Sequence, residues 1–260
     1  MLKEQRREKI LSEIHRKDSV TIEEVIALTN GSRSTARRDI EEMEQEHLLR
    51  RVRGGAMSIA PITAKVSSNE AEPPFHVRQD MFLGEKQRIA AAAHKLVSNN
   101  ETLLLGGGTT ILEFAKTLND ISPLYVATND LKSAVILADY PNVNLTVLGG
   151  SLRQNHYSLN GYFTEQMISQ MHADMTFIGI DAVDFNIGYM NFSTSEIQTN
   201  KLMLKASHKV VVLCDHSKFE RVAFVNICKL EDIDLLITGR EINPMYLEQL
   251  RERNINVMTV

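Results

Sequence analysis

Seven short apolar runs alternate with helical stretches from residue 84 to the end of the sequence. The apolar runs are TLLLG (102–106), LYVAT (124–128), NLTVLG (144–149), MTFIGI (175–180), KVVVLC (209–214), DLLIT (234–238) and NVMTV (256–260). The helical stretches are 84–97, 109–118, 130–139, 161–171, 194–207 and 244–253. Strands that alternate with helices predict an α/β domain with a largely parallel sheet. In such sheets, ligands bind beyond the carboxyl ends of the strands.

The first sixty residues have a different pattern, which is typical of three short helices. Thr21 and Glu24 match a capping box, in which each side chain satisfies a backbone amide at a helix start. Asn30-Gly31 favours a turn, because both residue types tolerate a left-handed backbone. Ser32 is a good cap for the helix that follows the turn. We therefore expect three helices within residues 3–60.

The third of these helices, SRSTARRDIEEMEQE, has two distinct faces. Ala36, Ile40 and Met43 repeat at the spacing of a buried face. Short polar and guanidinium side chains occupy the rest of its first turns, where they can contact phosphates and pair with guanine in the major groove. Asp39 is expected to pair with a neighbouring arginine. The candidate DNA contacts on this helix are Ser32, Ser34, Thr35, Arg37 and Arg38.

A basic hairpin is predicted directly after the third helix. Residues 48–53 are typical of a strand, Gly54-Gly55 can turn, and residues 56–59 can return. Such a hairpin is a wing suited to the DNA backbone or the minor groove, with Arg51 and Arg53 as candidate contacts. A small helical oligomerisation domain with a solvated charged face is the alternative. The ordered series of capped helix, turn, basic helix and basic hairpin favours DNA binding.

Proline positions and charge divide the chain into two domains. No proline precedes Pro61, and the stretch from Ser58 to Pro74 is rich in Ser, Ala, Thr and Pro, as linkers are. We expect a DNA-binding domain at 1–57, a linker at 58–74 and a second domain at 75–260. The formal net charge of −4 weakens a nucleic-acid role without excluding it, because a small DNA-binding domain can lie within an acidic chain.

The sequence predicts a cytoplasmic protein. No apolar run approaches the ~20 residues of a membrane-spanning helix. The segment MLKEQRREKI is charged throughout, unlike a secretory signal. Cys214 and Cys228 lie in apolar runs, which indicates buried thiols in a reducing compartment.

Polar groups follow five successive strands of the predicted sheet. The first group, Gly106 to Thr110, lies between a strand and a helix, where glycines let backbone amides approach an anion. No Lys follows, so this is not a Walker loop, and a simple tight turn is the alternative. The other groups are Thr128-Asn129-Asp130, Gly150 with Arg153, Asp181 with Asp184, and Asp215 with Ser217 and Lys218. Asp130 can equally cap the next helix.

No catalytic or metal centre is predicted from the sequence. Nothing has metal-ligand spacing, no nucleophilic triad stands out, and no cofactor is expected. His156, His208 and His216 are interpreted as surface or core histidines.

Both halves resemble the DeoR family of bacterial transcriptional regulators. The N-terminal part is similar to the family's winged helix-turn-helix through EQRREKIL, SxxTxRRDI and LLRRVRGGA, and departs from it at Ala36 and Arg53. The remainder resembles the family's sensor domain along nearly its whole length, through GGGTT, VATND, VLGGSLR, FIGIDAVD, GYMNFSTSE, Lys201 and VVVLCDHSKF. That domain is related in fold to ribose-5-phosphate isomerase and glucosamine-6-phosphate deaminase. The resemblance therefore implies a Rossmann-like α/β sugar-phosphate sensor domain.

The resemblance also implies the effector site. A phosphorylated sugar is expected, with its phosphate on residues 107–110. The family more often has Asp-Ser-Gly at 106–108 and Asp-Gly-Ile-Asp at 181–184, so this chain lacks one carboxylate that could bind a hydroxyl. The expected effector-binding residues are Gly107, Gly108, Thr109, Thr110, Thr128, Asn129, Asp130, Gly150, Arg153, Asp181, Glu196, Lys201 and Lys218.

The expected function is sequence-specific repression of sugar-catabolic genes, relieved by a phosphorylated sugar. The expected partners are operator DNA, the sugar phosphate and further copies of the chain, as a homodimer or higher homo-oligomer, with no membrane. One alternative is a sugar-phosphate isomerase or deaminase with an accessory DNA-binding domain, in which Asp181 and Asp184 serve as acid and base. Another is a ligand-independent DNA-binding protein whose sensor fold only dimerises.

Overall fold

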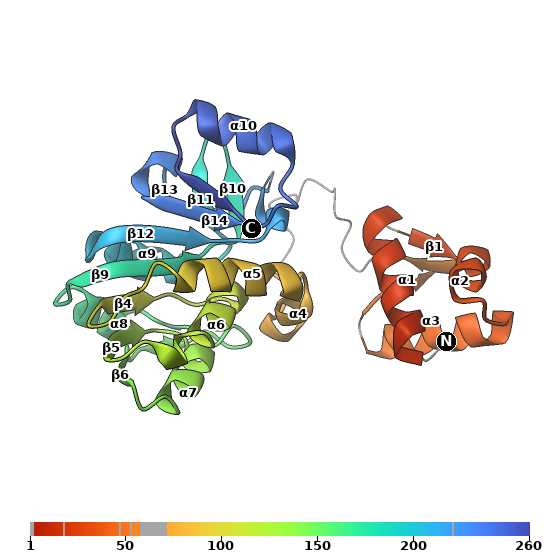
Figure 1. The fold of residues 1–260 in the computed structure, drawn as a ribbon, viewed down its shortest axis with the longest axis horizontal. Coiled ribbons are helices and arrows are strands. Elements are labelled where there is room, and N and C mark those ends of the chain that lie inside the picture. Colours follow the sequence, from red (N-terminus) through yellow and green to blue (C-terminus); the bar gives the residue numbers. More distant parts are fainter. Residues whose placement is uncertain (1–2, 18, 47, 53, 58–71, 220) are drawn as a thin grey trace. The chain divides into compact units, whose positions relative to one another are not determined.

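The computed structural model describes residues 3–17, 19–46, 48–52, 54–57, 72–219 and 221–260. The chain divides into two compact units, residues 1–64 and 65–260 (Figure 1). Each has its own hydrophobic core. The expected linker, 58–74, lies outside the described residues except for its last three. No helix within the described ranges is long and apolar enough to cross a membrane.

The first unit consists of three helices and a three-stranded antiparallel sheet. Its elements are α1 (Lys3–Lys17), β1 (Ser19–Thr21), α2 (Ile22–Thr29), α3 (Arg33–Gln45), β2 (Arg50–Val52) and β3 (Gly55–Met57). The strand order is β1-β3-β2. The predicted capping box begins α2, since Thr21 Oγ1 accepts from the Glu24 amide and Glu24 Oε2 accepts from the Thr21 amide. The three predicted helices and their caps are confirmed.

The hairpin differs from the prediction in the position of its turn. Gly55 was expected in the turn with Gly54, but it is the first residue of β3. A Cβ atom at Gly55 would lie 2.0 Å from the Val20 carbonyl oxygen. The reason is β1, which the sequence did not indicate and which pairs with β3 through Thr21 and Gly55. The third strand requires a residue without a side chain at this crossing.

The second unit is built on a seven-stranded parallel sheet. Its strands are β4 (Thr102–Leu105), β5 (Leu124–Thr128), β6 (Val143–Val147), β9 (Ala173–Gly179), β12 (Ser207–Leu213), β14 (Leu235–Thr238) and β15 (Val257–Thr259). They lie in the order β15-β14-β12-β9-β4-β5-β6, and every pair is parallel. These are the seven predicted strands, so the predicted α/β class and parallel sheet are confirmed.

Helices cover both faces of this sheet, which explains why the strands read as continuous apolar runs. The helices are α5 (Leu83–His94), α6 (Thr109–Ala115), α7 (Leu131–Ala138), α8 (Tyr162–Ile168), α9 (Ile197–Lys205) and α10 (Pro244–Glu252). Leu103 and Leu105 of β4 pack in the core that contains α5 and α6. Leu104, between them, faces the core that contains residues of α8 and α9. Figure 1 shows α5 and α6 on one side of the sheet and α8 and α9 on the other.

Several elements of the second unit were not predicted. They are α4 (Phe75–Asp80), the hairpin of β7 (Ser151–Leu152) and β8 (Leu159–Asn160), and the antiparallel sheet of β10 (Ala182–Asp184), β11 (Gly188–Asn191) and β13 (Val225–Cys228). The antiparallel sheet lies beside α10 at one end of the unit (Figure 1). Val183, Tyr189 and Ile227 share a core with Tyr246 of α10. The segments after β9 and β12 are therefore held in place by packing.

Candidate functional site

The start of α3 presents the polar surface that the sequence predicts. Ala36, Ile40 and Met43 are buried, whereas Arg37 and Arg38 are exposed and form no ion pair or hydrogen bond with any described residue. Ser32 caps the helix by accepting from the Thr35 amide at 3.2 Å, and its hydroxyl is also bonded to those of Ser34 and Thr35. The hydroxyls are thus ordered on the same surface as the two free guanidinium groups.

Internal ion pairs fix the elements beside this surface. Asp39 is buried and accepts two hydrogen bonds from the Arg6 guanidinium of α1, at 2.7 and 3.0 Å, as expected of a residue that pairs with an arginine. Arg51 of the wing pairs with Glu41 at 3.1 Å and with Glu44 at 3.6 Å. Arg53, the other predicted wing contact, lies outside the described residues.

A pocket lies at the carboxyl ends of the central strands β4, β9 and β12, where ligands are expected in a parallel sheet. Eight of the thirteen predicted effector-binding residues line this pocket. They are Gly107, Gly108, Thr109, Thr110, Arg153, Asp181, Glu196 and Lys218. Segments far apart in the sequence therefore meet where the strands end.

The other five predicted residues do not line the pocket. Thr128 donates to the Leu105 carbonyl oxygen, and Asn129 donates to the Leu159 carbonyl oxygen. Asp130 caps α7 by accepting from the Ser133 amide at 2.6 Å, and burial raises its pKa to about 6. Of these three residues, Asp130 lies against the glycine turn, since its Oδ2 would lie 3.5 Å from a Cβ atom at Gly107.

Gly150 and Lys201, the last two of the five, also lie outside the pocket lining. A Cβ atom at Gly150 would lie 2.1 Å from Thr164 Oγ1, so close packing requires this glycine. Lys201 is exposed on α9. Asp184, the second member of the alternative acid–base pair, accepts from the amides of Asn186 and Ile187 in the β10–β11 turn. It does not line the pocket with Asp181.

The pocket also contains a basic cluster that the sequence did not reveal. Glu72 extends its carboxylate between Arg78 and Arg153, whose guanidinium groups lie 2.7 and 2.6 Å away. His156 Nδ1 lies 3.3 Å from the same carboxylate. Burial opposes the charge on Glu72, but the His156 hydrogen bond and the two arginines outweigh it and lower the pKa of Glu72 to about 2.

Two further acidic side chains line the pocket beside this cluster. Glu196 accepts from Arg153 at 3.2 Å and from Ser158 at 2.7 Å. Asp181 Oδ2 accepts from the Phe192 amide, and its other oxygen lies 3.7 Å from Arg78. Burial, and then the charge of Glu72, raise the pKa of Asp181 to about 6. The pocket thus offers cationic groups for an acidic ligand and carboxylates that can accept from hydroxyls.

Sequence patterns gave little signal for the missed residues. Glu72 lies in the stretch assigned to the linker, and Arg78 precedes the first helical stretch of the α/β pattern. His156 and Ser158 belong to the short β7–β8 hairpin, and Asn191 belongs to the antiparallel sheet. Arg78 follows the expected linker, and His156 follows Gly149-Gly150 at the end of a strand. Residues in such contexts can lie almost anywhere on a protein surface. Only the tertiary fold brings them together.

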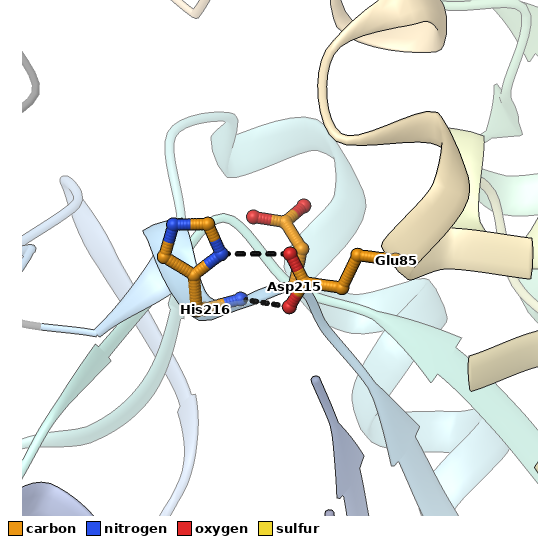
Figure 2. A group of neighbouring side chains, drawn as sticks. All are labelled: Glu85, Asp215 and His216. Atoms are coloured by element: carbon orange, nitrogen blue, oxygen red, sulfur yellow. Dashed lines mark hydrogen bonds and ion pairs between the residues drawn. The ribbon is translucent and has the colours of Figure 1, made fainter. Parts of the chain in front are cut away.

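A second cluster of titratable groups lies after β12, next to Lys218 in the sequence. Glu85 of α5 accepts from the His216 amide and from His216 Nδ1, both at 2.7 Å (Figure 2). Burial opposes a charged imidazole, but the hydrogen bond and the charge of Glu85 raise the pKa of His216. Glu85, His216 and Asp215 are close enough to hold a metal ion. However, both Glu85 oxygens already accept from His216, so the cluster fastens the end of β12 to α5.

Comparisons with known proteins agree with this arrangement. Residues 6–61 match the sequence model described as the DeoR-like helix-turn-helix domain. Residues 82–240, which carry most of the pocket, match the one described as the DeoR C terminal sensor domain. The chain belongs to the DeoR family. It is therefore a transcriptional regulator with a DNA-binding unit and a sensor unit.

Curated relatives match this DeoR-family regulator along nearly its whole length. The HTH-type transcriptional regulator GolR of Listeria innocua is 30% identical over 253 residues, 97% of each chain. The putative aga operon transcriptional repressor of Escherichia coli O157:H7 is 29% identical and covers 98% of this chain and 93% of its own. The glycerol-3-phosphate regulon repressor of Escherichia coli K12 is 28% identical and covers 99% of both. The names describe regulators, which supports a regulator over the isomerase or deaminase alternative.

Solved structures show only a partial likeness. Ribose 5-phosphate isomerase A from Methanocaldococcus jannaschii is 20% identical over 52% of this chain and 53% of its own, with a TM-score of 0.38. A likeness of that extent does not bear on function.

Proposed function

We propose that this regulator represses genes of sugar use and that a phosphorylated sugar in the sensor pocket lowers its affinity for operator DNA. The observation that carries the proposal is the pocket itself. It joins a glycine turn at residues 107–110 to the cationic groups of Arg78, Arg153 and Lys218 at the ends of three central strands. Backbone amides and cations of this kind suit a phosphoryl group, and Asp181 and Glu196 suit sugar hydroxyls.

The DNA-binding part of the proposal is supported by the free guanidinium groups of α3. Arg37 and Arg38 are exposed, and the first turn between Ser32 and Thr35 carries ordered hydroxyls. We propose that α3 enters the major groove and that Arg51 and Arg53 of the wing contact the backbone. We propose a DNA-binding domain at residues 1–57 and a sensor domain at residues 75–260, with a linker between them. We also propose that the protein is cytoplasmic.

Assembly into a homodimer or a larger homo-oligomer is part of the same proposal. Two copies would present two recognition helices to two half-sites. Exposed apolar side chains in the sensor unit support such an interface. Tyr162 and Phe163 of α8 stack edge to face at 5.6 Å with about 70% of their surface exposed, close in sequence to the exposed Leu152.

A thermal-shift screen of phosphorylated sugars and their unphosphorylated partners tests the sensor role. We expect at least one phosphorylated sugar to raise the melting temperature, and its neutral partner to have little effect. Gly107→Asp should abolish the shift, because it adds a negative charge to the turn that lines the pocket, beside Ser158, at a position without left-handed backbone. Gly84→Asp, at an exposed glycine in open space, adds the same charge as a control. A full shift in Gly107→Asp would exclude binding at this turn.

A further inference from the structure

Glu72 occupies the basic part of the sensor pocket as an anionic ligand would. Only 4% of its side chain is exposed. One carboxylate oxygen lies 2.7 Å from Arg78 and 3.3 Å from His156, and the other lies 2.6 Å from Arg153. Arginines bind carboxylate and phosphoryl groups in the same way, through paired N–H donors on planar forks. The cluster is therefore a built anion site that a side chain of the chain itself fills.

Charge balance shows that the cluster needs an anion. With Glu72 in place, the cations of Arg78, Arg153 and Lys218 balance three carboxylates, those of Glu72, Asp181 and Glu196. Without Glu72, two partly buried guanidinium groups would share the remaining carboxylates with Lys218. Unpaired buried charges are costly, so a departing Glu72 must be replaced.

The small volume of the pocket also indicates that a side chain must leave before a ligand binds. The free cavity is about 40 Å³, little more than the ~30 Å³ share of one water molecule in the liquid. Sites for small ligands usually hold ~300–1,000 Å³. A sugar phosphate can enter only if a side chain leaves.

Glu72 is the lining side chain that can leave without unfolding the unit. It lies before α4, whose first residue, Phe75, is buried and donates its amide to the Asn155 carbonyl oxygen. The other charged lining residues extend from α4 or from segments fixed between strands of the second unit. Release of Glu72 would leave the segment held by the Pro73 carbonyl oxygen, which accepts from Arg78 Nε at 3.0 Å, and by the buried Phe75.

We propose that Arg78, Arg153 and His156 form an oxyanion subsite, which Glu72 fills in the free protein and an acidic group of the effector fills in its place. This inference rests on the proposed function, since it takes the pocket to be the effector site. The ligand class follows from the chemistry. A phosphoryl group at residues 107–110 leaves the basic subsite for a second acidic group, a carboxylate or another phosphoryl, on the same sugar.

Calorimetric titration with inorganic phosphate at constant ionic strength tests the competition. Glu72→Gln keeps the size of the side chain and removes its charge, so we expect it to bind phosphate at least about tenfold more tightly than the wild type. If Glu72 fills the site nine-tenths of the time, only one-tenth of the protein can bind phosphate, and the apparent affinity is tenfold weaker. Asp80→Asn removes an equal charge at an exposed position of α4 outside the pocket and should bind as the wild type does. Adding Arg153→Gln to Glu72→Gln should remove the gain.

Three outcomes would overturn the inference. They are an unchanged phosphate affinity in Glu72→Gln, an equal gain in Asp80→Asn, and a gain that survives Arg153→Gln. If Glu72→Gln is unstable, phosphate must raise its melting temperature more than that of the wild type, and chloride at equal ionic strength must not. Failure of this rescue would also overturn the inference.

Acetate and phosphate titrations of Glu72→Gln distinguish a carboxylate subsite from a phosphoryl one. The sugar-phosphate screen separates this inference from the proposed function. If a sugar phosphate raises the melting temperature only when Gly107 is present, and Glu72→Gln gains no phosphate affinity, the sensor role stands. Only the proposed competition by Glu72 is then excluded.

Discussion

Arg37 and Arg38 are the exposed arginines of α3 on which DNA recognition is proposed to depend. Each is free of internal ion pairs within the described residues, so replacement by Ala should leave the fold unchanged. If one contacts a base, its loss should cost about 1–3 kcal/mol of operator binding and relax specificity at one position. A phosphate contact should instead lower the salt slope by about one. Anisotropy titrations on a selected operator measure both quantities.

The matched control for these variants is Arg251→Ala, at an exposed arginine of α10 in the sensor unit. It removes the same charge far along the chain and should leave operator affinity unchanged. Wild-type affinity in both Arg37→Ala and Arg38→Ala would contradict the assignment of α3 as the recognition helix.

The protonation of His216 is expected to make the free energy of unfolding depend on pH. Its folded-state pKa is raised by Glu85, so its contribution is fully present below the unfolded pKa of about 6.5 and is lost as pH rises through the folded pKa. Relative to Glu85→Gln, the wild type should be most stabilised near pH 6, and the advantage should shrink above that by at most about 1.4 kcal/mol per pH unit.

Urea unfolding between pH 5.5 and 9 checks this prediction, with Glu252→Gln on the exposed end of α10 as the control. A stability difference between wild type and Glu85→Gln that is constant over this range would show that Glu85 does not raise the pKa of His216.

At the scale of elements, the sequence indicated the parts with strong periodicity. The five inner strands were predictable because burial on both faces makes them nearly continuous apolar runs. The edge strands β6 and β15 are more exposed and were predictable from their β-branched and apolar residues. The capped helices were predictable from Thr21, Glu24 and Ser32, whose side chains bond the local backbone. These signals are local, and local signals suffice for such elements.

Elements that depend on distant partners were not predictable. The strand β1 is three residues long and exists through its pairing with β3. The antiparallel sheet combines β13 with β10 and β11, from segments about forty residues apart. The basic cluster of the pocket joins Glu72 and Arg78 to Arg153 and His156, about eighty residues later. The spacing of residues in a single sequence does not reveal such long-range tertiary contacts.

Gly55 gives an element-scale prediction for the wing. A methyl group there would lie 2.0 Å from the Val20 carbonyl oxygen, so Gly55→Ala should separate β1 from β3 and destabilise the first unit by about 2–3 kcal/mol. Operator affinity should fall with it. Gly84→Ala, in open space at the start of α5, should be neutral or slightly stabilising. Equal melting curves and operator affinities for Gly55→Ala and wild type would refute the pairing.

At the scale of the whole molecule, the proposal requires that the two units communicate. An effector that lowers operator affinity must itself bind less tightly when DNA is present, by the same factor. Couplings of about 1–3 kcal/mol are typical and correspond to roughly 5–150-fold. A ligand-independent DNA-binding protein, the remaining alternative, would show no such reciprocity.

The most direct test is an operator titration of the full chain with and without a saturating phosphorylated sugar that raises its melting temperature. We predict a 5–150-fold loss of operator affinity at about 1–3 kcal/mol of coupling, with little effect of the unphosphorylated sugar. Gly107→Asp should bind operator as the wild type does and should not respond to the sugar phosphate. An operator affinity that stays the same in the wild type when the sugar phosphate is bound would contradict the account.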